Sequence, residues 1–304
     1  MDLYLPIAGL SVNMLVIIGL GGLVGVLSGM FGVGGGFLTT PLMIFYGIPP
    51  AVAVASSAPQ ITGASVSGVL AHGSRDGVDY HMGAVLVAGG AIGSLAGGFL
   101  FRLLQDAGQI DTVVTVMYVV MLGGIGAVMA RDAIGSILAQ WRGESPPGSG
   151  RRHHPLIAML PFRWRFYRSG LYISPLAPLL LGFLTGVMTV LMGVGGGFIL
   201  VPAMIYILGM SARVVVGTSL FQILFVTAAT TMVHAMTTRA VDLVLTALLL
   251  IGSVTGAQLG ARLALKMKPE YLRLALAFIV LVVAIRMLLG LTWRPPEIFT
   301  VQVL

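Results

Sequence analysis

The sequence contains no cysteine and little charge, and each absence restricts what the protein can be. Without cysteine, the chain has no disulfide, no thiolate metal site and no cysteine nucleophile. Only 9% of the 304 residues are charged, whereas soluble globular proteins carry about 25% charged residues. So few charges cannot cover a water-facing surface, and most of the surface must therefore contact lipid.

Hydrophobic residues make up 57% of the chain, and they come in long runs. Stretches of about 20 apolar residues, enough to cross roughly 30 Å of hydrocarbon, recur along the sequence. Residues 243–254 and 278–285 are apolar on every face, whereas strands of a membrane β-barrel alternate apolar and polar side chains. The sequence therefore predicts an all-α integral membrane protein, with the lipid bilayer as its main surroundings.

The chain has a net charge of +7, and many of its basic residues lie in one segment. Residues 131–170 hold seven of the 17 Lys and Arg residues and the Pro/Gly/Ser-rich stretch 144–150. Short cytoplasmic loops of membrane proteins collect Lys and Arg. We therefore expect 131–170 to be a basic cytoplasmic loop between two membrane repeats, 1–130 and 171–304. Nucleic-acid binding is the alternative explanation of the charge, but a cytoplasmic loop already accounts for it, so we expect no nucleic-acid partner.

Five hydrophobic segments lie on each side of this loop. Because five is an odd number, two similar halves would cross the membrane in opposite orientations. If every segment crosses, most Lys and Arg residues fall on the side of the loop, which supports the cytoplasmic assignment. The expected segments are 8–30, 36–47, 50–71, 82–102 and 112–130, followed by 172–191, 197–209, 213–235, 243–263 and 271–290.

The two halves also match in sequence. The motif GVGGGF occurs at 32–37 and again at 193–198, and a proline follows each copy, Pro41 and Pro202. Further matches follow in the same order and pair Ser56 with Thr218, Ser57 with Ser219, Gln60 with Gln222 and His72 with His234. An ordered set of this kind indicates an internal duplication. With an odd number of segments in each half, it predicts two inverted-topology repeats, which are common in secondary transporters.

Glycines recur at every fourth position in three segments. On a helix this spacing forms one smooth stripe, and small residues let membrane helices approach closely. We expect these stripes to be helix-packing faces without a chemical role. They are Gly21, Gly25 and Gly29; Gly89, Gly93 and Gly97; and Gly252, Gly256 and Gly260.

The two GVGGGF motifs are helix breakers within hydrophobic sequence. About a dozen residues follow each motif, and at about 1.5 Å per residue they are too short to cross the bilayer core. Irregular backbone at membrane depth is tolerated only where protein or a water-filled cavity surrounds it. Short, glycine-interrupted helices at matching places in two halves point to a transporter's binding site.

A helix that begins after a glycine run presents N–H groups and a positive dipole end, which suit an anion. Neutral hydroxyl and amide groups would supply further donors. Each polar residue also has a structural alternative, a hydrogen bond to its own backbone or to a neighbouring helix, and the glycine runs have one as tight turns. The candidate substrate-binding residues are Gly34, Gly35, Gly36, Ser56, Ser57, Gln60, Gly195, Gly196, Gly197, Thr218, Ser219 and Gln222.

His72 and His234 lie at the ends of matching segments. Histidine takes up protons near neutral pH, so proton coupling is one interpretation, and a capping or water-facing histidine is the other. No residue spacing resembles a metal site, a phosphate loop or a nucleophile–base pair, so we expect neither metal nor cofactor. The acidic residues are scattered over different loops, which argues against an integral-membrane enzyme, whereas an anion channel of the same architecture stays open.

The doubled motif, with SSAPQ at 56–60 and TSLFQ at 218–222, resembles the TauE/SafE family of sulfite exporters and four-toluene-sulfonate-uptake permeases. The resemblance covers roughly 15–130 and 172–290. It implies a multi-pass permease of the inner membrane that moves a small sulfur-containing anion, such as sulfite or an organosulfonate. It also implies export as the direction of transport and a role for the glycine motifs in binding. We therefore expect a secondary transporter that works by alternating access.

Overall fold

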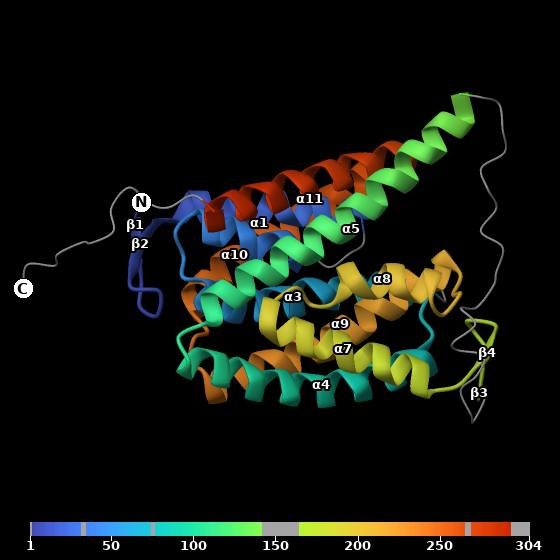
Figure 1. Cartoon of the computed structure of the whole chain (residues 1–304), viewed down its shortest axis with the longest axis horizontal. Helices are drawn as coiled ribbons and strands as arrows, with labels where there is room; N and C mark the ends of the chain where they lie inside the picture. Colours follow the sequence, from blue (N-terminus) through green and yellow to red (C-terminus); the bar gives the residue numbers. More distant parts are fainter. Residues whose placement is uncertain (1, 32–34, 74–76, 142–163, 265–268, 293–304) are drawn as a thin grey trace, which may run out of the picture.

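The structure is a computed structural model, and it describes residues 2–31, 35–73, 77–141, 164–264 and 269–292. Ten helices lie in this part of the chain. Figure 1 shows that most of them run along the long axis of the molecule, with a two-stranded hairpin at each end. The prediction of an all-α integral membrane protein is confirmed.

The elements of the two halves follow each other in the same order: a hairpin, a helix, a short helix and three long helices. The first half contains β1 (Asp2–Leu5), β2 (Leu10–Asn13), α1 (Met14–Phe31), α2 (Gly36–Phe45), α3 (Pro50–Gly73), α4 (Tyr80–Asp106) and α5 (Ile110–Trp141). The second half contains β3 (Trp164–Phe166), β4 (Leu171–Ile173), α7 (Leu176–Met192), α8 (Gly197–Tyr206), α9 (Ala212–Thr237), α10 (Leu243–Ala264) and α11 (Pro269–Thr292).

Two element boundaries differ from the sequence expectations. The first hydrophobic segment does not begin as a helix at residue 8, because residues 10–13 pair with 2–5 as an antiparallel hairpin. Helix α5 continues to Trp141, into the segment expected to be a loop. Its residues 133–139 are mostly Ala, Ile and Leu, which extend a helix readily. Residues 142–163 of the expected loop lie outside the described residues.

Five helices of the described chain are long and apolar enough to cross a membrane. These spans are Tyr80–Asp106, Ile110–Gly135, Val214–Thr237, Leu243–Gly260 and Leu274–Thr292. Helices α1 and α7 are apolar but shorter, with 18 and 17 residues. Helices α2 and α8 have 10 residues each; at about 1.5 Å per residue they extend only about 15 Å. As predicted, the helices after the glycine motifs are too short to cross the bilayer core.

The two halves are interleaved rather than stacked as separate bodies. The first helix of each half packs along the fourth helix of the other: α1 lies against α10, and α7 lies against α4. In Figure 1, α4 and α7 form one side of the molecule, α1 and α10 lie on the opposite side, and α3, α8 and α9 lie between them. The glycine motifs therefore lie in the middle layer.

The three glycine stripes form the contacts between the interleaved helices, as predicted. A Cβ atom on Gly25 of α1 would lie 2.7 Å from the Cα of Ser253 in α10, and one on Gly93 of α4 would lie 2.9 Å from the carbonyl carbon of Phe183 in α7. Such distances are shorter than real Cβ contacts, and the neighbours are backbone atoms that cannot rotate away. The stripes are packing faces that allow the backbones to touch.

Replacing Gly25 by alanine is expected to destabilise the protein by more than about 2 kcal/mol, because the added methyl group overpacks the contact between α1 and α10. Gly19→Ala in the same helix is the matched control, since a Cβ there meets no described atom within 4 Å. Thermal unfolding of the detergent-purified variants measures the difference. Equal unfolding temperatures for Gly25→Ala and Gly19→Ala would contradict this account of the stripe.

A buried aspartate before α4 holds the hairpin of the second half. The Oδ1 atom of Asp79 accepts a hydrogen bond from the Met82 N–H at 3.1 Å and so caps α4. Its Oδ2 atom accepts from the N–H of Ser169 at 3.0 Å and from the Ser169 hydroxyl at 2.5 Å. Ser169 lies in the turn between β3 and β4. Asp79 is 1% exposed, so this first-half residue fixes a second-half hairpin from inside the protein.

Asp242, in the second half, holds the hairpin of the first half in the same way. Its Oδ1 atom accepts from Val244 N–H at 3.0 Å and Leu245 N–H at 3.1 Å at the start of α10. Its Oδ2 atom accepts from the Ile7 N–H at 3.2 Å, in the turn between β1 and β2. The side chain is fully buried. Each half therefore contributes one aspartate that anchors the hairpin of the other half.

Candidate functional site

The two glycine motifs meet in the interior of the molecule. Phe37 and Phe198, which end the two GVGGGF copies, stack with ring centroids 4.5 Å apart and an angle of 12° between the rings. A Cβ atom on Gly36 would lie 2.8 Å from the carbonyl oxygen of Val194. The first motif therefore touches the second through both its phenylalanine and its last glycine. Gly34 lies outside the described residues.

The glycines place the N-termini of α2 and α8 at this contact. Gly35 and Gly196 precede the two helices with φ angles of 72° and 75°, and Gly195 has φ 72°. Only glycine adopts this left-handed conformation without strain. The first N–H groups of a helix have no partner within that helix, and no described side chain caps either N-terminus. Both N-termini are buried, so they present donors inside the protein.

Ser57 connects α3 to the second glycine motif. Its hydroxyl lies within hydrogen-bonding distance of two acceptors, the carbonyl oxygens of Gly193 at 2.9 Å and of Val54 at 2.8 Å. It also accepts from the Thr40 hydroxyl of α2 at 3.2 Å. Its partner in the second half, Ser219, donates to the Val216 carbonyl at 2.9 Å. Each serine of the pair thus lies within hydrogen-bonding distance of a carbonyl oxygen in the preceding turn of its own helix.

Ser56 and Thr218 bond to backbone beside the two buried aspartates. The N–H of Asp242 donates to Ser56 Oγ at 2.9 Å, and the N–H of Asp79 donates to Thr218 Oγ1 at 2.9 Å. These bonds join α3 and α9 to the residues just before α10 and α4 of the opposite half. Ser56 and Thr218 thus hydrogen-bond to protein backbone, which was the alternative to substrate binding. Ser57, by contrast, contacts a glycine motif directly.

Gln222 is hydrogen-bonded to Thr185 of α7, near the start of α8. Its Nε2 atom donates to Thr185 Oγ1 at 3.4 Å, and the Thr185 hydroxyl donates its own proton to the Gly182 carbonyl at 2.9 Å. In this arrangement the Thr185 hydroxyl accepts a hydrogen bond from the amide nitrogen of Gln222. A Cβ atom on Gly196 would lie 3.2 Å from the Cβ of Thr185, so one side chain separates the amide from the motif.

Gln60 holds the matching position in the first half. It is 1% exposed, and its neighbour Ile61 packs on both motifs: the Ile61 side chain would collide with a Cβ atom on Gly36 and lie 3.0 Å from one on Gly195. Gln60 is thus next in the chain to a residue that packs on both motifs, and Gln222 bonds to a threonine that packs beside Gly196.

Three buried side-chain atoms in the described part of the chain have no hydrogen-bond partner: Gln60 Oε1, Ser65 Oγ and Gln222 Oε1. All three belong to α3 and α9, which pack on each other. A buried polar group without a partner costs about 1–3 kcal/mol, so native proteins contain few of them. A bound molecule with hydrogen-bonding groups would supply the partners that these atoms lack.

Several threonines around the motifs were not identified from the sequence. Thr189 Oγ1 would lie 3.3 Å from a Cβ atom on Gly196, and Thr62 of α3 bonds to Thr227 of α9 at 2.8 Å between the hydroxyl oxygens. The spacing of Thr185 and Thr189, four residues apart just before GVGGGF, was the available signal. It places both hydroxyls on the same face of α7.

The histidine pair is described in part. His72 lies in α3, but its side chain is outside the described residues. The ring of His234 is fully buried, and its Nε2 atom lies 3.0 Å from the carbonyl oxygen of Val190, to which it donates. Its Nδ1 atom lies 3.3 Å from Thr238 Oγ1. His234 therefore joins α9 to α7 from within the protein and does not face water.

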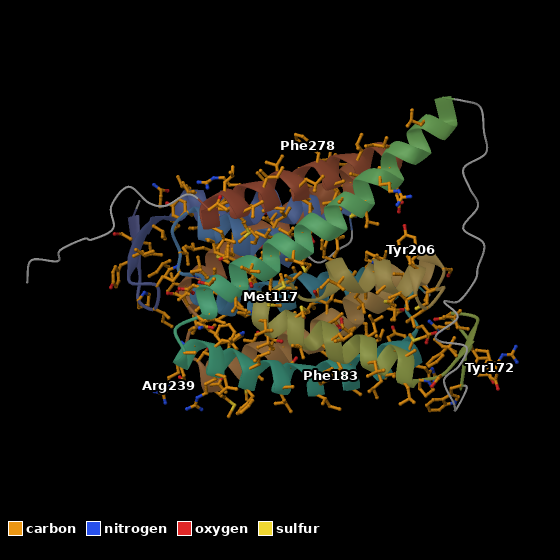
Figure 2. All side chains as sticks on the ribbon, viewed as in Figure 1. Met117, Tyr172, Phe183, Tyr206, Arg239 and Phe278 are labelled. Atoms are coloured by element: carbon orange, nitrogen blue, oxygen red, sulfur yellow. The ribbon has the colours of Figure 1, made fainter. Side chains whose placement is uncertain are left out.

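An apolar groove of about 490 Å³ lies between α5 and α8. Phe198 forms part of its wall, so the groove reaches the stacked phenylalanine pair. Figure 2 shows Tyr206 at the end of α8, on the side that faces α5, where its hydroxyl donates to Asp132 Oδ2 at 3.1 Å. No motif marks this groove in the sequence. Within the described residues, no cluster of three acidic, histidine or cysteine side chains could hold a metal ion.

Comparisons with known proteins give one consistent answer. The family model of the sulfite exporter TauE/SafE matches residues 17–287. YjnA of Bacillus subtilis, a probable membrane transporter protein, is 27% identical over 273 residues, which cover 90% of this chain and 98% of the relative. A probable membrane transporter protein of Xylella fastidiosa strain 9a5c is 25% identical over 284 residues, which cover 93% of this chain and 96% of the relative.

A second Bacillus subtilis relative, the probable membrane transporter protein YunE, is 25% identical over 294 residues, which cover 92% of this chain and 98% of the relative. No solved structure matches the chain. The family model spans nearly all of the described helices, and the structure supplies the long apolar helices that a membrane transporter requires. The chain therefore belongs to the sulfite exporter TauE/SafE family and is a membrane transporter.

Proposed function

We propose that this transporter moves a small sulfur-containing anion, such as sulfite or an organosulfonate, out of the cell across the inner membrane. The observation that supports it most is the meeting of two buried, uncapped helix N-termini beside two buried glutamines with unpartnered oxygens. The free N–H groups at these helix N-termini are donors that hold oxyanions without a buried cation. The direction of export follows from the family description alone.

The binding residues proposed are the described glycines of the two motifs together with Gln60 and Gln222. Ser57 and Ser219 position the adjacent backbone through their carbonyl contacts. Ser56 and Thr218 are proposed to act through the helix contacts that they make with the Asp242 and Asp79 N–H groups. Proton coupling through His72 and His234 is a separate proposal, and it requires His234 to release the Val190 carbonyl to which its ring donates.

Alternating access through two inverted repeats is the proposed mechanism. The hairpins that begin the two halves lie at opposite ends of the molecule (Figure 1), as inverted repeats require. A groove between α5 and α8 reaches Phe198. The matching helices of the two halves are α11 and α2, and there Arg286 of α11 covers the ring of Phe45 at 5.5 Å. On the alternating-access proposal, this difference between the halves belongs to one of the two states of the transporter. On this proposal residues 131–170 face the cytoplasm.

The test replaces the two glutamines together, Gln60→Ala with Gln222→Ala. Flux of radiolabelled sulfite or taurine through proteoliposomes is expected to fall at least about tenfold, since both amides leave the site. The exposed pair Gln105→Ala with Gln258→Ala, on α4 and α10, is the matched control and should transport normally. Normal flux in the first double variant would remove the proposed site. Flux that rises without saturation as anion concentration increases would favour a channel.

A further inference from the structure

The unpartnered oxygens of Gln60 and Gln222 bear on which hydrogen-bonding groups the substrate carries, in addition to its charge. Both atoms are acceptors, both are buried, and neither meets a donor among the described residues. In the structure, the amide nitrogen of Gln222 donates to Thr185 Oγ1, and the Thr185 hydroxyl donates to the Gly182 carbonyl. The Oε1 atom of Gln222 therefore requires a donor from elsewhere.

A fully deprotonated oxyanion cannot provide that donor. Its oxygens accept hydrogen bonds, so they suit the N–H groups at the starts of α2 and α8. Against a glutamine carbonyl oxygen, however, they bring lone pair toward lone pair and leave the acceptor unsatisfied. The site thus combines donors that suit an anion with two acceptors that an oxyanion alone does not fill.

We propose that the transported anion carries its own hydrogen-bond donor, a hydroxyl, an ammonium or an acidic O–H group, which the Oε1 atoms of Gln60 and Gln222 receive. This inference rests on the proposed function and narrows the substrate class. It includes hydrogen sulfite, hydroxyalkanesulfonates and aminoalkanesulfonates. It disfavours sulfate, the sulfite dianion and unsubstituted alkanesulfonates.

Two sulfonates of nearly equal size provide a matched comparison. 2-Hydroxyethanesulfonate and propane-1-sulfonate share the anionic group and differ in a terminal hydroxyl against a terminal methyl. Sites built to bond a hydroxyl discriminate strongly against analogues that lack it, because buried polar groups are then left unpaired. We expect the hydroxyl compound to bind at least about tenfold more tightly to the purified full-length protein, measured by calorimetry or by ligand-dependent thermal shift.

A variant with leucine in place of glutamine tests whether the amides are responsible. Gln222→Leu retains the approximate size but removes the acceptor, and the preference for the hydroxyl compound is expected to fall toward unity. Gln258→Leu, at an exposed position of α10, should leave the preference unchanged.

The outcomes separate this inference from the function on which it rests. Equal affinity of the wild-type protein for the two sulfonates would overturn the inference, because the acceptors would then be filled by water or left empty, while anion transport would stand. A preference that persists in Gln222→Leu and in Gln60→Leu would also overturn it. Absence of binding by either sulfonate, by sulfite and by taurine would overturn the proposed function itself.

Discussion

Replacing Gly196 by alanine is expected to reduce transport by about 100-fold. Gly196 has φ 75° and directly precedes α8, and a Cβ atom there would lie 3.2 Å from the Cβ of Thr185 and 3.3 Å from Thr189 Oγ1. Alanine therefore brings two costs. The left-handed conformation is unfavourable for it by about 1–2 kcal/mol, and the methyl group must displace the threonines or the start of α8. A displacement of about 1 Å in a binding site can cost about 100-fold in rate.

The control for Gly196→Ala is Gly108→Ala, in the connection between α4 and α5. Gly108 has φ 67°, and a Cβ atom there meets no described atom within 4 Å. The two substitutions carry similar backbone strain, but only the first places a methyl group at the glycine motif. Proteoliposome flux and thermal unfolding should show similar losses of stability and a loss of transport in Gly196→Ala alone. If both variants transport equally, the donors at the start of α8 do not bind substrate.

Replacing Asp79 by alanine is expected to destabilise the protein by more than about 3 kcal/mol. The carboxylate accepts three hydrogen bonds, from Met82 N–H, Ser169 N–H and the Ser169 hydroxyl. Loss of a helix cap costs about 1 kcal/mol, and each buried donor left without a partner costs about 1–3 kcal/mol more. The β3–β4 hairpin would also lose its attachment to the first half.

Asp111→Ala is the control for this second prediction. Asp111 is an exposed acidic residue in the first turn of α5, so its loss removes a similar charge near a helix start without removing a tether. Asp242→Ala should behave as Asp79→Ala does, because it anchors the β1–β2 hairpin. Thermal unfolding in detergent measures all three. An unfolding temperature of Asp79→Ala equal to that of Asp111→Ala would show that the hairpin contact contributes nothing to stability.

Local sequence features predicted the helices, the short segments after the glycine motifs and the packing stripes. These depend on composition, segment length and residue spacing, which act within one element. The hairpins were missed because strands of three or four residues leave no long alternating pattern, and because β2 runs directly into the apolar helix α1. The end of α5 was missed because the basic composition around it masked residues that favour a helix.

Matching positions in the two halves predicted which polar residues to examine, but their roles depended on partners far away in the chain. Ser56 and Ser57 are adjacent, yet one accepts from the Asp242 N–H and the other donates to the Gly193 carbonyl. No spacing in the sequence distinguishes them. Asp79 and Asp242 occupy matching positions in the two halves, but their role could not be predicted because the hairpin turns that they bind belong to the opposite half.

The sequence by itself determined that the protein is helical, that it lies in a membrane and that it breaks a helix at two matching places. Those properties follow from how each segment interacts with lipid and with its own backbone, which nearby residues decide. Only the tertiary structure decided that the halves interleave, that the two motifs touch through Phe37 and Phe198 and that Gln60 of α3 and Gln222 of α9 keep unpartnered oxygens. These contacts join residues distant in the chain, and their geometry exists only once the helices have packed.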